Sequence, residues 1–410
     1  MGWLRGWFAA FGRCVLVAVA LSACSAAKNA SKVGAKPRSA KGAGALPAGS
    51  AGSTTSGSGG GAAAVAGAAG AASSDRDGAT DAAPSDAGDG APGSSDAAIA
   101  DGGGSSDAAI ARAPIDPPVA GGCVTDVTPG SHELPCDGTT HVVTVSEECT
   151  KVACGVIVDV HGGSMSADME DKNTTMRVLG PMHGYIVIQP NASPNDLLAG
   201  ERIFVAGMDD DRVMHILMDV IAAFHVDQKR IHMMGFSEGG FMTWRWICGH
   251  SDLLASAAPA AAGWNCTVLP ITEEIGCQFS GTDVPKQHIP TLYMQGSMDM
   301  LMDPQCVFSW LSSNVYPTLS LDKGNKIAGD ATFERTRFLD PDKVPFELIR
   351  HEYSTDATFF GVAVGGHCYP GSTDFDVTLP GQLMGFGCKN MCSFTWAEEV
   401  VRFFMEHPKS

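Results

Sequence analysis

From about residue 150 to the end of the chain, short apolar runs alternate with stretches that carry apolar residues on one side. Continuous runs rich in Val and Ile predict buried parallel strands, and one-sided helical spacing predicts amphipathic helices. The strands are expected at residues 152–160, 185–189, 230–234, 253–262 and 291–295. The helices are expected at residues 212–224, 241–248 and 397–405. This alternation predicts an α/β fold with a mostly parallel central sheet and helices on both faces.

A serine lies at the junction between one of these strands and the following helix. The segment Gly235-Phe236-Ser237-Glu238-Gly239 follows the apolar run 231–234 and opens a helical pattern. This spacing is typical of a nucleophile elbow, whose sharp turn needs glycines two residues before and after the serine. The spacing alone also arises by chance in a chain with 49 glycines, but its strand-and-helix context is much rarer. Ser237 is therefore the candidate nucleophile.

A serine nucleophile needs a base that is held in place by a third group. In folds that use this elbow, an acid and then a histidine follow the serine along the chain. Asp299 comes directly after the predicted strand at 291–295, and Asp303 is its alternative. Functional loops of such sheets lie at the carboxyl ends of the strands. We favour Asp299 because it lies nearer the strand end.

The candidate base is His367. It stands in Gly365-Gly366-His367-Cys368-Tyr369-Pro370-Gly371, where flanking glycines allow an exposed and mobile loop after a strand-like stretch. His351 and His288 are the alternatives, but their polar surroundings predict solvated side chains.

Acyl transfer by a serine also needs two backbone N–H groups to stabilise the developing oxyanion. One is expected from Glu238, the residue after the nucleophile, and the other from Gly163. Gly163 ends the His161-Gly162-Gly163 loop that follows the first buried strand of the globular part. The alternative interpretation of this loop is a plain tight turn.

With these residues assembled, the chain resembles the polyhydroxybutyrate depolymerase and feruloyl esterase group of secreted α/β-hydrolases. The resemblance covers most of residues 150–405 in order, and only a few blocks are specific. These are Val226-Asp227 through Arg230-Ile231, the serine motif Gly235 to Met242, Ala258-Pro259 through Gly263, and Gly365-Gly366-His367 with Pro370-Gly371.

The resemblance implies cleavage of carboxylic esters, either in polyester chains or between aromatic acids and plant polysaccharide. It also implies a triad of Ser237, Asp299 and His367, with Gly163 and Glu238 as oxyanion donors. The sequence departs from the group at Glu238, where a small or neutral residue is usual. It departs again at Cys368, which we interpret as a disulfide cysteine that fixes the histidine loop.

The first 24 residues predict a lipoprotein-type signal peptide. Arg5 and Arg13 precede or flank a short apolar core that ends in Leu21-Ser22-Ala23-Cys24. Such a segment is too short to remain as a membrane-spanning helix. Cys24 resembles the lipidated cysteine of bacterial lipoproteins, and Ser25 after it favours the outer membrane. The alternative is an ordinary secretory peptide, and both predict export.

Residues 25–120 consist mostly of Ala, Gly, Ser, Asp and Pro and include a duplicated Ser-Ser-Asp-Ala-Ala-Ile-Ala segment. This composition does not bury enough apolar surface to offset the entropy of ordering, so it predicts a disordered tether. The predicted domains are thus the signal peptide at 1–24, the tether at 25–120 and a catalytic domain at 121–410.

The composition argues against some classes of partner and indicates the compartment in which the protein folds. The net charge of −18, without a Lys/Arg cluster, argues against nucleic acid or an anionic membrane surface as partner. The chain has 13 cysteines without a zinc-binding spacing, which favours disulfides in an oxidising compartment. Eleven of them follow Cys24, so at least one thiol stays unpaired, and Cys154 in its apolar run is our candidate.

Neither a metal nor an organic cofactor is expected for the proposed chemistry, and the substrate is expected to be a small ester or a polymer. Trp264 is a candidate for the acyl pocket, although core packing explains it equally well. The run Met294, Met298, Met300 and Met302 is interpreted as packing. Residues 311–345 are irregular enough to form a lid, a question the sequence leaves open.

Two other classes of function remain, and a third, a structural cell-envelope lipoprotein, would explain the leader and the tether but not the triad. A serine peptidase of the prolyl-oligopeptidase-like branch shares this triad order, but it usually carries a propeller or lid domain that is not visible here. A non-catalytic surface binding protein on a hydrolase scaffold is the second alternative. It predicts loss of the serine or the histidine, and the sequence retains both candidates.

Overall fold

The computed structural model describes residues 112–195, 201–269, 276–359, 362–373, 386–389 and 391–409. The predicted signal peptide and all but the last few residues of the predicted tether lie outside these ranges. Backbone contacts divide the chain into residues 1–99 and 100–410, and every described residue belongs to the second unit. Within the described ranges, no helix combines the length and the apolar character that a membrane crossing requires.

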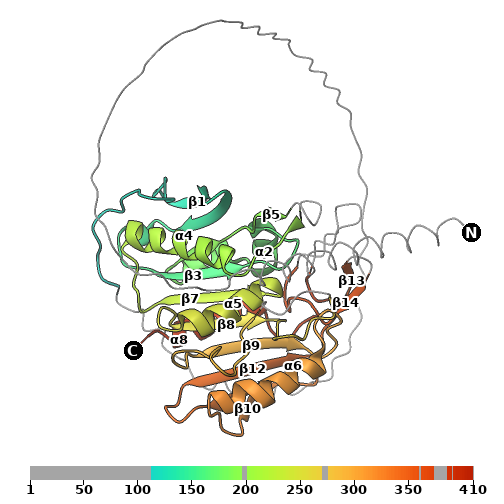
Figure 1. The fold of residues 1–410 in the computed structure, drawn as a ribbon. Helices are drawn as coiled ribbons and strands as arrows, with labels where there is room; N and C mark the ends of the chain where they lie inside the picture. Colours follow the sequence, from blue (N-terminus) through green and yellow to red (C-terminus); the bar gives the residue numbers. More distant parts are fainter. Residues whose placement is uncertain are drawn as a thin grey trace, which may run out of the picture. The chain divides into compact units, whose positions relative to one another are not determined.

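A ten-stranded sheet runs through the centre of the described unit (Figure 1). In spatial order its strands are β1 (Gly130–Cys136), β2 (Thr139–Val145), β4 (Tyr185–Gln189), β3 (Gly155–Val160), β7 (Ile231–Phe236), β8 (Ser256–Ala260), β9 (Thr291–Gly296), β12 (Pro345–His351), β11 (Phe333–Leu339) and β10 (Asn325–Gly329). The six strands from β4 to β12 are parallel, whereas both edges are antiparallel. This topology confirms the predicted α/β-hydrolase fold.

Two short hairpins lie outside the main sheet. They pair β5 (Pro194–Asn195) with β6 (Glu201–Arg202) and β13 (Thr355–Phe359) with β14 (Val362–Gly365). The second hairpin leads directly into the histidine loop.

Helices cover both faces of the sheet, as the sequence predicts (Figure 1). They are α2 (Ala167–Thr174), α3 (Met176–Met182), α4 (Met208–Phe224), α5 (Glu238–His250), α6 (Pro304–Trp310), α7 (Tyr316–Thr318) and α8 (Trp396–Glu406), with a 3-10 turn at Glu148–Thr150 and a π-helical turn at Leu311–Val315. Alternate residues of β3 serve two cores: Val156 and Val158 pack with α4 and α5, whereas Ile157 packs with α3 and α8. The continuous apolar run of this strand thus reflects burial on both sides.

Residues 311–345, considered above as a lid, instead complete one edge of the sheet. They form the π-helical turn, α7, and the antiparallel strands β10 and β11, which extend the sheet beyond β12. The irregular sequence reflects an edge that faces solvent, because β10 is exposed along its whole length.

Five disulfides join described cysteines and confirm the disulfide prediction. They are Cys123–Cys136, Cys149–Cys154, Cys248–Cys277, Cys266–Cys306 and Cys368–Cys388. The choice of Cys154 as the unpaired thiol is wrong: it bonds Cys149 in the 3-10 turn five residues earlier, and Cys392 is the described cysteine outside these bonds. Burial in an apolar run suits a disulfide as well as a thiol, so the apolar context did not distinguish them.

Candidate active site

Ser237 occupies a sharp turn between β7 and α5. Its backbone has φ 55° and ψ −114°, a strained conformation for a residue with a side chain. A Cβ on Gly235 would overlap the backbone of Gly239, and a Cβ on Gly239 would overlap the carbonyl of Val160. Both glycines of the motif are therefore required by close backbone approach, as in a nucleophile elbow.

Asp299 and His367 lie in direct contact at the end of β9. The Nδ1 atom of His367 is 2.8 Å from Oδ2 of Asp299, and the two residues are 1% and 5% exposed. The backbone N–H groups of Leu301 and Met302 donate to Oδ1 of Asp299 at 2.9 and 2.8 Å, and Gln295 donates to Oδ2 at 3.0 Å. The carboxylate is thus fixed on both oxygens before it meets the imidazole.

The competing acid and base residues have other places in the fold. Asp303 caps the N-terminus of α6 by accepting a hydrogen bond from the Gln305 N–H at 3.0 Å. The prediction that His351 and His288 are solvated is wrong. His351 is 1% exposed, and burial lowers its pKa to about 4; the mostly buried His288 pairs with Asp340 at 2.9 Å. His351 ends β12 and His288 precedes β9, and both turn inward although the polar residues beside them in sequence are exposed.

The histidine loop reaches the serine turn through Phe236. The Phe236 ring, next to Ser237 in the chain, lies 4.7 Å from the imidazole of His367 and stacks on Tyr369 at 4.0 Å. Within the described residues no hydrogen bond joins the hydroxyl of Ser237 to His367. Catalytic hydrogen bonds often shorten only when substrate is bound, so this geometry is compatible with a base.

A covalent bond also fixes the histidine loop. Cys368, the residue after His367, forms a disulfide with Cys388. This is the role that the sequence predicted for Cys368. Backbone hydrogen bonds from Gly366 to Met298 and from Met300 to Val364 tie the same loop to the Asp299 turn, at 2.7 and 3.1 Å.

The loop after β3 lies against the serine turn. The Cβ position of Gly162 is 3.5 Å from Cβ of Ser237, and that of Gly163 is 3.5 Å from Oε2 of Glu238. Among the described residues, neither Gly163 nor Glu238 gives its backbone N–H to a backbone carbonyl in the loops. The structure therefore places the Gly162-Gly163 loop beside Ser237 and the side chain of Glu238.

Trp264 and the four methionines singled out from the sequence have different surroundings. Trp264, in the loop after β8, is partly buried and packs against the core on the α5 face, which favours its structural role. The packing interpretation holds for Met294 and Met302, but Met298 and Met300 are 45% and 51% exposed beside the histidine loop. They flank Asp299 in the turn after β9, where side chains are no longer enclosed on both sides as they are in the strand.

Sequence reasoning missed a pair of buried carboxyl groups beneath the histidine loop. Asp159 on β3 and Glu170 on α2 are both 0% exposed. Tyr369 donates to Glu170 at 2.6 Å, whereas Gln189 and Thr174 donate to Asp159 at 2.8 and 2.9 Å. Burial raises the pKa of Asp159 to about 6 and that of Glu170 well above its usual value. The signal available in the sequence was Asp159, a charged residue inside the apolar run of β3. Its partner Glu170 lies on α2, a separate element.

We expect Asp159→Asn to flatten the dependence of stability on pH. The wild-type carboxyl has a pKa of about 6 when folded and about 3.9 when unfolded. Its favourable contribution is greatest below about pH 4 and is lost as the pH rises through 6, a loss of about 3 kcal/mol in all, of which about 2 kcal/mol falls between pH 4 and 6. Asparagine keeps the acceptor and cannot ionise. Urea unfolding at both pH values measures the change.

The exposed Asp211→Asn provides the control for that measurement, because removing a surface carboxylate of α4 leaves the buried pair intact. An equal loss of unfolding free energy between pH 4 and 6 in wild type and Asp159→Asn would contradict the assignment of this titration to Asp159.

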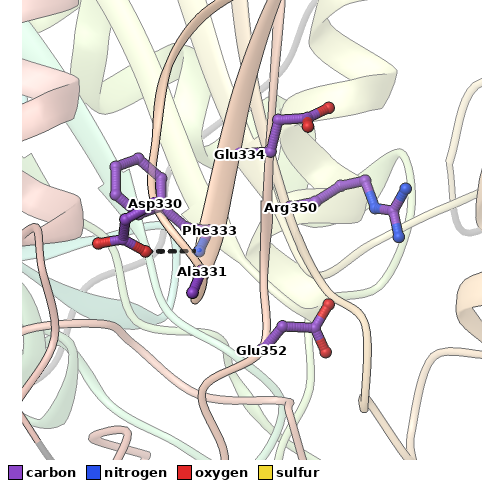
Figure 2. Close-up of a pocket in the computed structure, with 6 residues that line it drawn as sticks. All are labelled: Asp330, Ala331, Phe333, Glu334, Arg350 and Glu352. Carbon is purple, nitrogen blue, oxygen red and sulfur yellow. Dashed lines mark hydrogen bonds between the residues drawn. The ribbon is translucent and has the colours of Figure 1, made fainter.

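A separate pocket of about 170 Å³ lies beside β11 and β12 (Figure 2). Its lining combines three acidic side chains, one basic side chain and two apolar ones: Asp330, Ala331, Phe333, Glu334, Arg350 and Glu352. Asp330 accepts hydrogen bonds from the backbone of Phe333 and from Ser393. None of these residues belongs to the group around Ser237, so the pocket is distinct from the candidate active site.

Comparisons with known proteins match only part of the chain. No family model matches. A bifunctional acetylxylan esterase/xylanase of Neocallimastix patriciarum is 21% identical over 160 residues, which is 38% of this chain. The match spans only 21% of that protein.

Solved structures give weak overall superpositions. An acetyl xylan esterase from Aspergillus awamori has 17% identity and a TM-score of 0.37, covering 52% of this chain and 87% of its own. An S-formylglutathione hydrolase from Staphylococcus aureus has 20% identity and a TM-score of 0.34, covering 44% of this chain and 84% of its own.

Proposed function

We propose that this chain is a carboxylic-ester hydrolase that acts through an acyl-enzyme on Ser237. The observation that carries the proposal is the buried hydrogen bond between His367 and Asp299, in a loop that packs on the residue before Ser237. An elbow serine and a histidine oriented by a carboxylate are the groups that acyl transfer needs. The partial sequence match to an acetylxylan esterase/xylanase supports an ester as substrate.

In this mechanism His367 takes the proton of Ser237 as the hydroxyl oxygen attacks the ester carbonyl carbon. Asp299 keeps the imidazole in the tautomer that accepts this proton at Nε2. The backbone N–H groups of Gly163 and Glu238 stabilise the oxyanion. The C–O bond to the alcohol then breaks, and His367 returns its proton to the leaving oxygen. Water repeats the sequence on the acyl-serine and releases the acid.

The proposed substrates are acyl esters of a polymer or small molecule, as in the polyhydroxybutyrate depolymerase and feruloyl esterase group. We further propose that the enzyme is exported and lipid-anchored at Cys24. Five disulfides in the described residues support an oxidising compartment. A tether of about 95 residues would span roughly 50–60 Å and hold the catalytic domain away from a membrane surface.

A substrate panel tests this function on the purified full-length chain. It comprises p-nitrophenyl acetate and butyrate, acetylated xylan, a feruloyl ester, polyhydroxybutyrate and a proline-containing peptide anilide. We expect turnover of the p-nitrophenyl esters and of at least one ester polymer. Cleavage of the anilide without ester turnover would favour the peptidase alternative. A folded chain inert on the whole panel would leave the non-catalytic binding protein.

A further inference from the structure

The side chain of Glu238 turns inward, although it follows the nucleophile at the start of α5. Its Oε2 atom is shielded from solvent and has no hydrogen-bond partner in the described part of the chain. The same atom lies 3.5 Å from the Cβ position of Gly163. The carboxyl group therefore packs directly behind the loop that would hold the oxyanion.

The charges around Glu238 do little to stabilise an anion there. Arg245, seven residues further along α5, directs its guanidinium to Asp210 at 2.9–3.1 Å. Asp209, at the start of α4, is a buried acid and disfavours a second negative charge. The segment at 203–207 contributes apolar side chains and an interaction of the Phe204 backbone with the carboxyl.

The other two loops of the site carry histidines, whose charge depends on pH, rather than permanently charged lysine or arginine side chains. His161, in the loop after β3, packs its ring 4.5 Å from Phe204, and His367 faces the serine turn from the histidine loop. Burial is the largest effect and raises the pKa of Glu238 to about 8, with Asp209 acting in the same direction and Phe204 and Arg245 against it. An acid without an adequate donor set in a dry site is expected to keep its proton.

We propose that Glu238 is a positioning residue that supports the oxyanion loop only as a neutral carboxylic acid, so that its ionisation switches the reaction off. The inference rests on the proposed ester hydrolysis and adds a control of that site. An ionised carboxylate behind Gly163 would oppose the negative charge that the transition state places on the carbonyl oxygen. The neutral acid adds no negative charge, so the N–H dipoles of Gly163 and Glu238 can stabilise the oxyanion in full.

The proposal predicts an alkaline fall in kcat/KM for p-nitrophenyl acetate. With a midpoint near 8, the neutral fraction and hence the activity should drop roughly 10- to 30-fold between about pH 7 and about pH 9.5. Glu238→Gln has the same shape and cannot ionise, so its kcat/KM should keep within about twofold over that interval. The exposed Glu398→Gln on α8 is the matched control and should retain the wild-type fall.

The profiles are measured on full-length protein after subtraction of spontaneous hydrolysis, with circular dichroism at each pH. Infrared difference spectra, wild type minus Glu238→Gln at about pH 7, should contain the carbonyl band of a protonated carboxyl group. The same alkaline fall in Glu238→Gln, a flat wild-type profile, or absence of that band would overturn the inference. Wild type without ester turnover at any pH would overturn the proposed function itself, which distinguishes the two failures.

Discussion

Ser237→Ala should lower kcat for p-nitrophenyl acetate by on the order of a thousandfold or more, because no acyl-enzyme can then form. The substitution removes one oxygen atom and leaves the turn and its flanking glycines unchanged, so the fold should persist. Initial rates at saturating substrate, with circular dichroism on both proteins, measure the effect. The small residual rate would come from the oxyanion donors and binding alone.

Ser312→Ala is the matched control for the nucleophile. Ser312 is an exposed serine of the π-helical turn, and its hydroxyl donates to the carbonyl of Ser309 at 3.0 Å. Its loss should leave kcat within about twofold, as expected for a surface substitution. A Ser237→Ala protein that is folded and keeps most of its activity would refute Ser237 as the nucleophile.

Asp299→Asn should reduce kcat by on the order of ten-thousandfold, with a much smaller change in KM. The amide cannot accept the Nδ1 proton of His367 in the way that the carboxylate does, so the imidazole is held in the wrong tautomer. The backbone donors of Leu301 and Met302 would still find an oxygen at the same position. Steady-state kinetics on the short-chain esters give the two parameters.

Asp303→Asn distinguishes the two candidate acids by the same change of atoms. Asp303 caps α6, and asparagine is also a good cap, so stability should fall by about 1 kcal/mol or less. We expect its kcat to remain close to that of wild type. Comparable losses in the two variants would remove the argument that Asp299 alone orients the base.

Two kinds of contact hold the candidate base in place. The contacts over shorter sequence separations are the Cys368–Cys388 disulfide, 20 positions apart, and the backbone hydrogen bonds to the Asp299 turn. The long-range contact is the hydrogen bond from Tyr369 to the buried Glu170, which bridges 199 positions of sequence. The prediction of an exposed histidine loop is therefore wrong: residues 366–370 are buried, and these contacts hold His367 in one position.

The sequence determined those features that depend on near neighbours along the chain. Apolar runs located five of the six parallel strands, all but β12, because a strand buried on both faces must be apolar at successive positions. The serine motif was visible because the glycines that permit a sharp turn lie two residues away from Ser237. Cysteine number and spacing indicated disulfides, but pairing depends on which segments meet in space.

Only the tertiary structure decided what depends on contacts between distant segments. Asp299 and Asp303 stand four residues apart in similar surroundings, and only the place of His367, 68 residues later, separates them. The inward turn of Glu238 likewise follows from the loop after β3 and the segment before α4. A local pattern shows which residue types are present, whereas burial and partners are set by packing, which joins residues without regard to their separation in sequence.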